Sequence, residues 1–232
     1  MLKKIFIFLC VVMTISVKAK AESPGTIINE AWPFMIWIKN AEVYDGLKVK
    51  EVLAGNIYLD TYEKTHTGSK KILNVELKPG LFHHEFQKGD FVDFYGSVRD
   101  AASYTQDGEL ITFRDGGISP LPRIRMDTQL QANVFDQNGN HSIINHPLLK
   151  FPYRNVSVQE IDLRIRKMLV EKEGWYKAFD NSKIKGKIGI HFKDGSERFI
   201  YLHHLYDYRT NEHIDITSIN HFDLYLGEKY ID

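Results

Sequence analysis

The spacing of apolar residues changes about halfway along the chain. Up to about residue 119, short apolar runs stand between turn residues, as in Phe34–Ile38, Asn56–Leu59, Ile72–Leu77 and Phe91–Tyr95. Glycines and small polar clusters separate these runs, which is the pattern of short strands joined by turns. About five short strands without a long helix predict a small β-barrel in this half.

The second half contains one segment with helical spacing. We predict a helix from Ser157 to about Glu173, with Gly174 ending it. Ser157 and Glu160 stand at the N-cap and N3 positions of a capping box. The apolar stripe of the helix comprises Val158, Ile161, Ile165, Met168 and Leu169. The charged positions away from the centre of the stripe are Asp162, Arg164, Arg166 and Lys167. This spacing is typical of a helix that packs one face on a core.

Strands surround the predicted helix. A hairpin turns at Asp136–Asn140, where Asn-Gly is a strong turn signal. After the helix, strands at Lys187–Phe192 and Arg198–His203 are joined by the turn Lys193–Ser196, and a last strand runs from about His221 to Leu226. One helix on a mixed sheet of two hairpins and a final strand predicts a β-grasp domain, so the fold class is α+β.

The N-terminus predicts export, and the middle of the chain predicts two domains. Residues 1–21 have a basic start, an apolar stretch and Ala19-Lys20-Ala21, which together indicate a secretory signal peptide cleaved after about Ala21. Its apolar run is too short to span a bilayer, so we expect a secreted protein without membrane insertion. Two glycines and two prolines in residues 116–122 favour a boundary there, which gives domains 22–120 and 121–232.

Composition excludes several function classes. The 30 basic and 30 acidic side chains give zero formal charge. Because no basic stripe is present, nucleic-acid binding is not expected. Cys10, the only cysteine, lies inside the predicted signal peptide. The mature chain therefore offers no disulfide, thiolate zinc site or cysteine nucleophile.

The last strand carries the candidate chemistry. Side chains alternate across a strand, so Phe222, Leu224 and Leu226 would face the core while His221 and Asp223 face outward. Positions two apart on a strand are separated by about 6.6 Å, a gap that an imidazole and a carboxylate can bridge to one ion. The same alternation turns His191 outward on the strand Lys187–Phe192. If the two strands are neighbours, the three residues converge.

Two imidazoles and one carboxylate suit Zn²⁺ and leave its fourth position open, for a catalytic water or for a ligand from a partner molecule. A second copy of the chain could also supply that ligand, giving a zinc-mediated homodimer. His-x-Asp alone is a weak signal, because the chain has 10 histidines and a second copy of the motif at His213-Ile214-Asp215. The competing interpretation is an exposed His and Asp that share a hydrogen bond. Ordinary surface or loop positions are expected for His66, His83, His84, His141, His146, His203 and His204.

The segment Asn155–Leu169, continuing to Tyr176, resembles the second signature of the staphylococcal and streptococcal superantigen exotoxins and their superantigen-like relatives. Tyr153 stands where that family usually has Lys, and Trp175 replaces an aliphatic residue. The run Asp115–Ser119 is similar to a degraded first signature, and Phe86–Gly96 is similar to a barrel strand of the family. The C-terminal segment His221–Leu226 is similar to the C-terminus of its zinc-dependent members. Without a cysteine pair, this chain lacks the disulfide loop of the classical enterotoxins, as several streptococcal members do.

This resemblance implies an N-terminal OB-fold barrel followed by a C-terminal β-grasp domain. It also implies that His221 and Asp223 match the zinc-binding pair and that His191 matches the third ligand of some members. Other members place the third ligand where this chain has Glu197. In the zinc-dependent members, a histidine of the class II MHC β chain completes the zinc site, and the toxin also engages the T-cell receptor Vβ region.

Three functions follow from these observations. The leading one is a non-enzymatic superantigen that joins class II MHC to T-cell receptor Vβ. The alternative is a superantigen-like immune-evasion protein that binds glycans, complement or immunoglobulin, a branch that generally lacks the His-x-Asp pair. A zinc hydrolase is the third, but it would need a general base beside the metal in a dry cleft, and the chain has no His-Glu-x-x-His.

Overall fold

The computed structural model describes residues 38, 40–53, 56–64, 68, 70–76, 86–104, 110–118, 124–173, 185–204 and 213–230. The predicted signal peptide, the predicted domain boundary at residues 120 and 121, and Gly174 lie outside these residues. The expectations for these segments therefore stay predictions.

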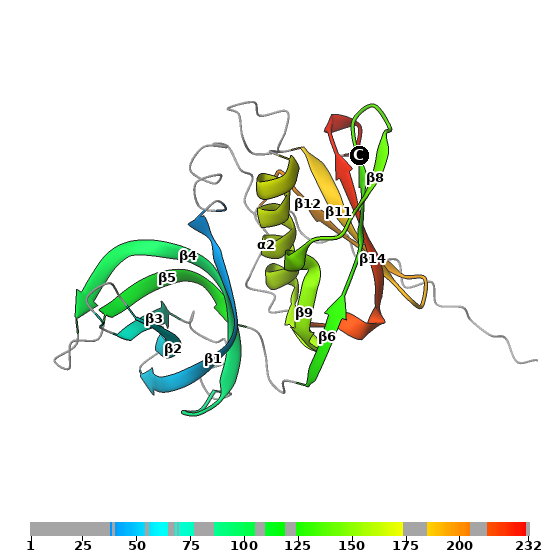
Figure 1. Cartoon of the computed structure of the whole chain (residues 1–232). Helices are drawn as coiled ribbons and strands as arrows, with labels where there is room; N and C mark the ends of the chain where they lie inside the picture. Colours follow the sequence, from blue (N-terminus) through cyan, green and yellow to red (C-terminus); the bar gives the residue numbers. More distant parts are fainter. Residues whose placement is uncertain are drawn as a thin grey trace, which may run out of the picture.

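Five strands close into a barrel in the first half of the chain (Figure 1). They are β1 (Glu42–Leu53), β2 (Asn56–Lys64), β3 (Lys70–Glu76), β4 (Phe91–Tyr104) and β5 (Leu110–Ile118). Their order around the barrel is β1-β2-β3-β5-β4, with β3 and β5 parallel and the other neighbours antiparallel. The predicted barrel is thus confirmed, and five strands in a Greek-key order are typical of the OB type.

Two expectations for this half are wrong. The run Phe34–Ile38 was expected to be a strand, but Ile38, its one described member, is helical and packs into the core of the second domain. Gly116 and Gly117 were expected to interrupt regular structure, yet β5 continues through both of them to Ile118. The Tyr95 ring and hydroxyl occupy the space that a side chain at Gly117 would fill. This glycine therefore serves close packing within a strand.

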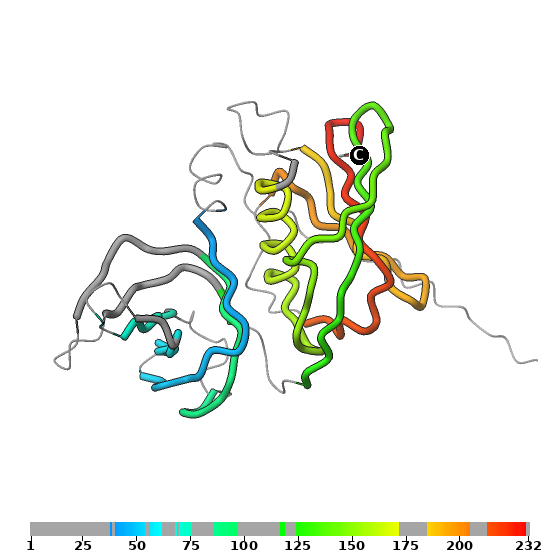
Figure 2. Tube along the Cα trace, in the orientation of Figure 1, coloured from blue at the N-terminus to red at the C-terminus, as the bar shows by residue number. Residues whose placement is uncertain are grey.

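The second half is built on a five-stranded sheet in the order β12-β11-β14-β7-β8. Its strands are β7 (Ala132–Phe135), β8 (His141–Ile144), β11 (Gly186–Phe192), β12 (Glu197–Tyr201) and β14 (Ile219–Leu226). The late strand β14 runs between the two hairpins, antiparallel to β11 and parallel to β7 (Figure 2). This arrangement confirms the predicted mixed sheet of two hairpins and a final strand.

The helix α2 (Val158–Met168) packs across this sheet and continues as a π-helical turn, Leu169–Glu173. Its predicted apolar stripe is fully buried. The Ser157 side chain accepts a hydrogen bond from the Glu160 backbone N–H at 3.1 Å, which confirms the predicted N-cap. The Glu160 carboxylate also accepts a hydrogen bond from the Arg164 side chain at 2.8 Å.

The polar side of α2 is also buried. Asp162, Arg164 and Arg166 are 7%, 2% and 1% exposed, although helical spacing assigned them to positions away from the core stripe. Figure 1 shows α2 between the sheet and the barrel, and Arg164 donates to Asp45 of the barrel strand β1 at 2.6 Å. Arg166 donates to the Asp162 carboxylate at 2.7 Å and to the Leu202 carbonyl at 2.8 Å. The sheet face opposite α2 points away from the barrel, and we call it the outer face.

Short elements complete the second half. The remaining strands pair as β6 (Arg125–Gln129) with β9 (Lys150–Tyr153) and as β10 (Asn155–Ser157) with β13 (His213–Asp215). Single 3-10 turns occur at Pro147–Leu149, Ile216–Ser218 and Glu228–Tyr230. The predicted hairpin turns are confirmed, with Gly139 and Gly195 at φ values of 86° and 84°, in the left-handed region that favours glycine.

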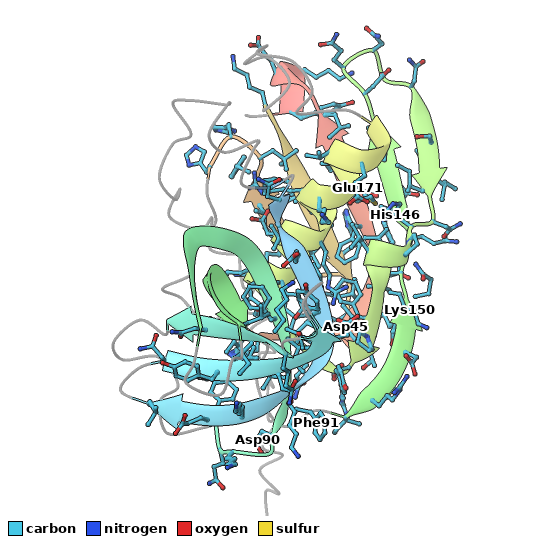
Figure 3. All side chains as sticks on the ribbon, turned by 60° about the vertical axis from the view of Figure 1, so that its left-hand side comes forward. Asp45, Asp90, Phe91, His146, Lys150 and Glu171 are labelled. Carbon is cyan, nitrogen blue, oxygen red and sulfur yellow. The ribbon has the colours of Figure 1, made fainter. Side chains whose placement is uncertain are left out.

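Polar contacts join the barrel to the start of α2. Ser157 donates its hydroxyl to the Tyr95 hydroxyl of β4 at 2.7 Å, and both side chains are buried. Arg164 donates to Asp45 of β1 at 2.6 Å as well as to Glu160. Asp45 lies where β1 passes the second domain (Figure 3). Ser157 and Arg164 therefore tie α2 and its N-cap to the barrel.

Candidate metal centre

Strand register brings the predicted ligands together on the outer face. Phe222, Leu224 and Leu226 face the core at 0%, 0% and 7% exposure, which turns the intervening residues of β14 outward. In the antiparallel pair β11–β14, His191 stands opposite His221, and Gly189 stands opposite Asp223. The adjacency of strands that the sequence argument had to assume is therefore present.

His191, His221 and Asp223 form what we call the histidine cluster, in which one donor atom of each lies within 4.8 Å of the others. His191 Nε2 lies 2.9 Å from Asp223 Oδ2, and His221 Nε2 lies 3.4 Å from Asp223 Oδ1. The two imidazole rings are stacked, with centroids 4.6 Å apart and an 8° angle between their planes. Donor atoms around a tetrahedral zinc ion are separated by about 3.4 Å, given bonds of about 2.1 Å. The three residues fit that spacing.

Asp223 is held in place by its neighbours. Its Oδ1 accepts a hydrogen bond from Asn133 Nδ2 at 2.8 Å, and its Oδ2 accepts one from the Tyr225 hydroxyl at 3.0 Å. Burial and this hydrogen bond raise the pKa of Tyr225 to about 12, so the phenol remains a donor at neutral pH. These contacts explain why Asp223 is only 8% exposed although it lies on the outer face. Such contacts fix the orientation of a metal-binding carboxylate.

The two ring nitrogens of His191 have different surroundings. Nδ1 lies 3.1 Å from a Glu197 carboxylate oxygen of β12. Nε2 is buried and makes no hydrogen bond to any described residue, because its close approach to Asp223 lacks hydrogen-bond geometry. A buried nitrogen without a hydrogen bond is costly. A metal ion at the histidine cluster would remove that cost.

Gly189 leaves space beside the donor atoms. A Cβ built at Gly189 would lie 3.1 Å from His191 Nε2, 3.3 Å from Phe199 Cε1 and 3.5 Å from Tyr225 Cε2. The missing side chain thus leaves a small recess bounded by one ligand ring and two aromatic rings. Together with the unbonded Nε2, this recess shows that the residues present fit a bound metal ion.

Within the described part of the chain, the second His-x-Asp motif and the His203-His204 pair do not form a comparable group of metal ligands. In the second His-x-Asp copy, Asp215 binds Arg154 at 2.7 Å and caps the 3-10 turn through Thr217. His203 packs edge-on against His204 with ring centroids 4.2 Å apart, and burial lowers its pKa. Among the described residues, neither His203 nor His213 belongs to a group of possible metal ligands.

Sequence reasoning missed the residues that support the ligands. Tyr225 could have been found, because alternation along β14 puts it on the same face as Asp223. Asn133 could not, because its place beside Asp223 depends on the parallel pairing of β7 with β14. The recess at Gly189 depends on side chains from three strands and leaves no local signal.

A second group of carboxylates, which we call the acidic cluster, comprises Asp45, Asp93 and Glu160. It lies at the junction of the barrel and α2, where the Arg164 guanidinium donates to Asp45 and to Glu160. Asp93 accepts a hydrogen bond from the Gly46 backbone N–H at 2.6 Å. The Arg164 guanidinium therefore neutralises two of the three carboxylates, Asp45 and Glu160.

Comparison with known proteins agrees with this architecture. Residues 130–226 match the family described as "Staphylococcal/Streptococcal toxin, beta-grasp domain". "Exotoxin type G" of Streptococcus pyogenes serotype M3 is 24% identical over 195 residues, which cover 79% of this chain and 80% of that protein. Among the described residues, no helix combines the length and apolar character needed to cross a membrane.

Solved structures share the fold. The Streptococcus dysgalactiae-derived mitogen has a TM-score of 0.63 at 23% identity, covering 88% of this chain and 98% of its own. A superantigen-like protein from Staphylococcus aureus, solved in complex with 3-N-acetylneuraminyl-N-acetyllactosamine, has a TM-score of 0.60 at 20% identity, covering 85% and 98%. These proteins thus share the fold of this chain, a barrel followed by a β-grasp domain. Residues 130–226 thus match the β-grasp domain of the staphylococcal and streptococcal toxins, and the chain as a whole is similar to exotoxins of the superantigen and superantigen-like groups.

Proposed function

We propose that the chain is a secreted, non-enzymatic superantigen that binds Zn²⁺ through His191, His221 and Asp223. The observation that carries this proposal is the convergence of the three donor atoms on the outer face, with His191 Nε2 buried and unbonded within the described structure. Zinc held by three protein ligands accepts a fourth donor. The ion would supply a bond between this protein and a side chain of its partner.

The surroundings of the cluster favour binding over hydrolysis. A zinc hydrolase needs a general base directed at the metal-bound water. Glu197 is the nearby carboxylate outside the cluster, and it faces Nδ1 of His191, on the side of the ring away from the donor atoms. The alternation along β14 puts the cluster on the outer face of the sheet, and Figure 1 shows that the barrel lies on the opposite side of this sheet, beyond α2.

The partners follow from the family rather than from the structure. The proposed donor of the fourth ligand is the class II MHC β chain, and the proposed second partner is T-cell receptor Vβ, so that the toxin causes polyclonal T-cell activation. Export would follow removal of residues 1–21, leaving domains 22–120 and 121–232.

Surface plasmon resonance of the mature chain on immobilised class II MHC tests this function. We expect binding in zinc, loss of binding in chelator, and recovery when zinc is added back. His221→Ala and Asp223→Ala should abolish binding. His141→Ala is the matched control, since this exposed histidine lies on β8 of the same sheet outside the cluster. Chelator-insensitive binding would remove zinc from the mechanism.

The alternative function is that of a superantigen-like immune-evasion protein, and the similarity of fold to the S. aureus protein solved with a sialylated glycan favours it. T-cell cultures separate the two functions, because a superantigen expands a subset skewed in Vβ usage and the alternative expands none. Sedimentation velocity with and without zinc tests the remaining possibility, in which a second copy of the chain supplies the fourth ligand and dimers form.

A further inference from the structure

Glu197 lies beside the histidine cluster but is not one of its three candidate metal ligands. It is the first residue of β12 and stands directly opposite His191 across the β11–β12 pair. The tight turn before it is fixed by Asp194, which accepts hydrogen bonds from the Ser196 backbone at 2.9 Å and the Ser196 hydroxyl at 2.6 Å. Register and turn together hold the Glu197 carboxylate 3.1 Å from His191 Nδ1.

A neutral imidazole carries one proton, on either Nδ1 or Nε2, and only the other nitrogen has a lone pair for a metal. Two carboxylates compete for that proton in His191. Asp223 lies 2.9 Å from Nε2, and Glu197 lies 3.1 Å from Nδ1. A proton on Nε2 would block two ligands at once, because it would occupy the His191 lone-pair position and draw Asp223 into a hydrogen bond.

We infer that Glu197 is a positioning residue that accepts the Nδ1 proton of His191 and so keeps Nε2 free for the metal. The inference rests on the proposed function for the identity of the metal. The contacts of Nε2 support it, since this nitrogen lies near Asp223 without hydrogen-bond geometry. Glu197 is not a fourth ligand, because it lies on the opposite side of the His191 ring from the donor atoms of the cluster.

Gly189 complements Glu197. With the His191 ring fixed by Glu197, Nε2 lies over Gly189, at 3.1 Å from the position of an added Cβ. A side chain there would press on the same nitrogen that Glu197 keeps available. Glu197 thus sets the tautomer of His191, and Gly189 leaves room for the lone pair on Nε2.

The direct test is ¹⁵N NMR of the histidine rings in the metal-free mature protein at about pH 8, where free imidazoles are neutral. We expect His191 to carry its proton on Nδ1 in the wild type and on Nε2 in Glu197→Ala. Glu197→Gln should keep the Nδ1 proton, because the amide oxygen can still accept it. A wild-type His191 protonated on Nε2, or a tautomer unchanged in Glu197→Ala, would overturn the inference.

Zinc affinity, measured by competition with a chromophoric chelator, gives the second readout. We expect Glu197→Ala to bind zinc about 10- to 100-fold more weakly, as is usual when such a hydrogen bond is lost, and Glu197→Gln to lose less. Glu228→Ala is the control, because Glu228 is a 64% exposed carboxylate that pairs with Lys185 instead. Equal affinities for Glu197→Ala and Glu228→Ala would also overturn the inference.

The absorption spectrum of bound Co²⁺ separates positioning from ligation. At saturating Co²⁺ we expect the same spectrum for the wild type and Glu197→Ala, whereas loss of a ligand would change it and contradict the inference. The tautomer measurement needs no metal. If His191 shows the expected tautomers but the wild type binds no zinc, the proposed function fails and the assignment of the proton stands.

Discussion

Among the described residues, possible metal ligands come together in the acidic cluster and in the histidine cluster, and the two clusters differ in what neutralises them. The acidic cluster at the domain junction contains its own cation, the Arg164 guanidinium, which is 2% exposed and bonded to Asp45 and Glu160. In the histidine cluster on the outer face, His191 Nε2 makes no hydrogen bond among the described residues. Judged only by the distances between their donor atoms, both clusters could hold a metal ion. The difference in resident partners indicates a structural role for the first and a binding role for the second.

Two glycines show the same contrast. The space beside Gly117 is filled by Tyr95, whose hydroxyl also accepts a hydrogen bond from the N-cap Ser157. The space beside Gly189 stays open between His191, Phe199 and Tyr225. Near the domain junction the packing is closed, whereas on the outer face a recess remains next to an unbonded nitrogen.

The largest expected effect is on stability at the acidic cluster. Arg164→Ala removes the guanidinium from Glu160, which is 0% exposed, and should lower the free energy of unfolding by about 3–5 kcal/mol. Urea denaturation measures this loss. Lys167→Ala is the matched control on the same helix, because its pair with Glu171 is partly exposed and should contribute under about 1 kcal/mol. Equal losses in the two variants would contradict a structural role for Arg164.

The next effect comes from zinc at the histidine cluster. Zinc at about 100 times its dissociation constant should raise the free energy of unfolding of the wild type by about 2.7 kcal/mol, because the ion binds the folded chain alone. Urea denaturation with zinc and with chelator measures the difference. His221→Ala should show no such rise. A rise of the same size in that variant would place the bound zinc elsewhere.

The two glycines should respond differently to the same added methyl group. Gly117→Ala forces Tyr95 away from Ser157 and should cost about 1–3 kcal/mol of stability. Gly189→Ala requires its neighbours to move by only a few tenths of an ångström, so we expect little loss of stability but weaker zinc binding. Guanidinium denaturation and a zinc titration of both variants test this. Reversed effects would contradict the contrast between the two regions.

The smallest expected effect concerns Asp215, the carboxylate of the second His-x-Asp copy. The hydrogen bond from Arg154 lowers its pKa in the folded state, so its contribution is fully present above about pH 4 and is lost as the pH falls through the lowered value. Asp215→Asn keeps the cap of the 3-10 turn but removes the charge. The variant should be less stable at pH 7 by about 0.2–1 kcal/mol.

Urea denaturation of wild type and Asp215→Asn at pH 7 and at about pH 3 checks this prediction. The stability difference between the two proteins should shrink at the lower pH. A difference that persists unchanged would mean that the charge of Asp215 does not account for it.

The sequence predicted the features that depend on the spacing of residues within a single strand or helix. Alternation along β14 correctly assigned Phe222 and Leu224 to the core and turned His221 and Asp223 outward. The helix and its N-cap followed from spacing and from Ser157. The site prediction assumed that β11 and β14 are neighbouring strands, an assumption that the predicted β-grasp fold supported.

The rest depends on contacts between segments that are distant in sequence. Helical spacing could not show that Arg164 is buried, because the barrel that covers it is built more than 40 residues earlier in the chain. For the same reason the sequence could not show the role of Gly117, which was expected to interrupt regular structure and instead packs against Tyr95. Glu197 was considered as a ligand of the site, and only the pairing of β12 with β11 shows which nitrogen of His191 it faces.

Anomalous diffraction at the zinc absorption edge, from crystals of the mature protein grown with zinc, decides whether the histidine cluster is a metal site. We predict a peak on the outer face within about 2.0–2.2 Å of His191 Nε2, His221 Nε2 and an Asp223 carboxylate oxygen. A map with no peak between these three residues at saturating zinc would contradict the zinc site and the function built on it.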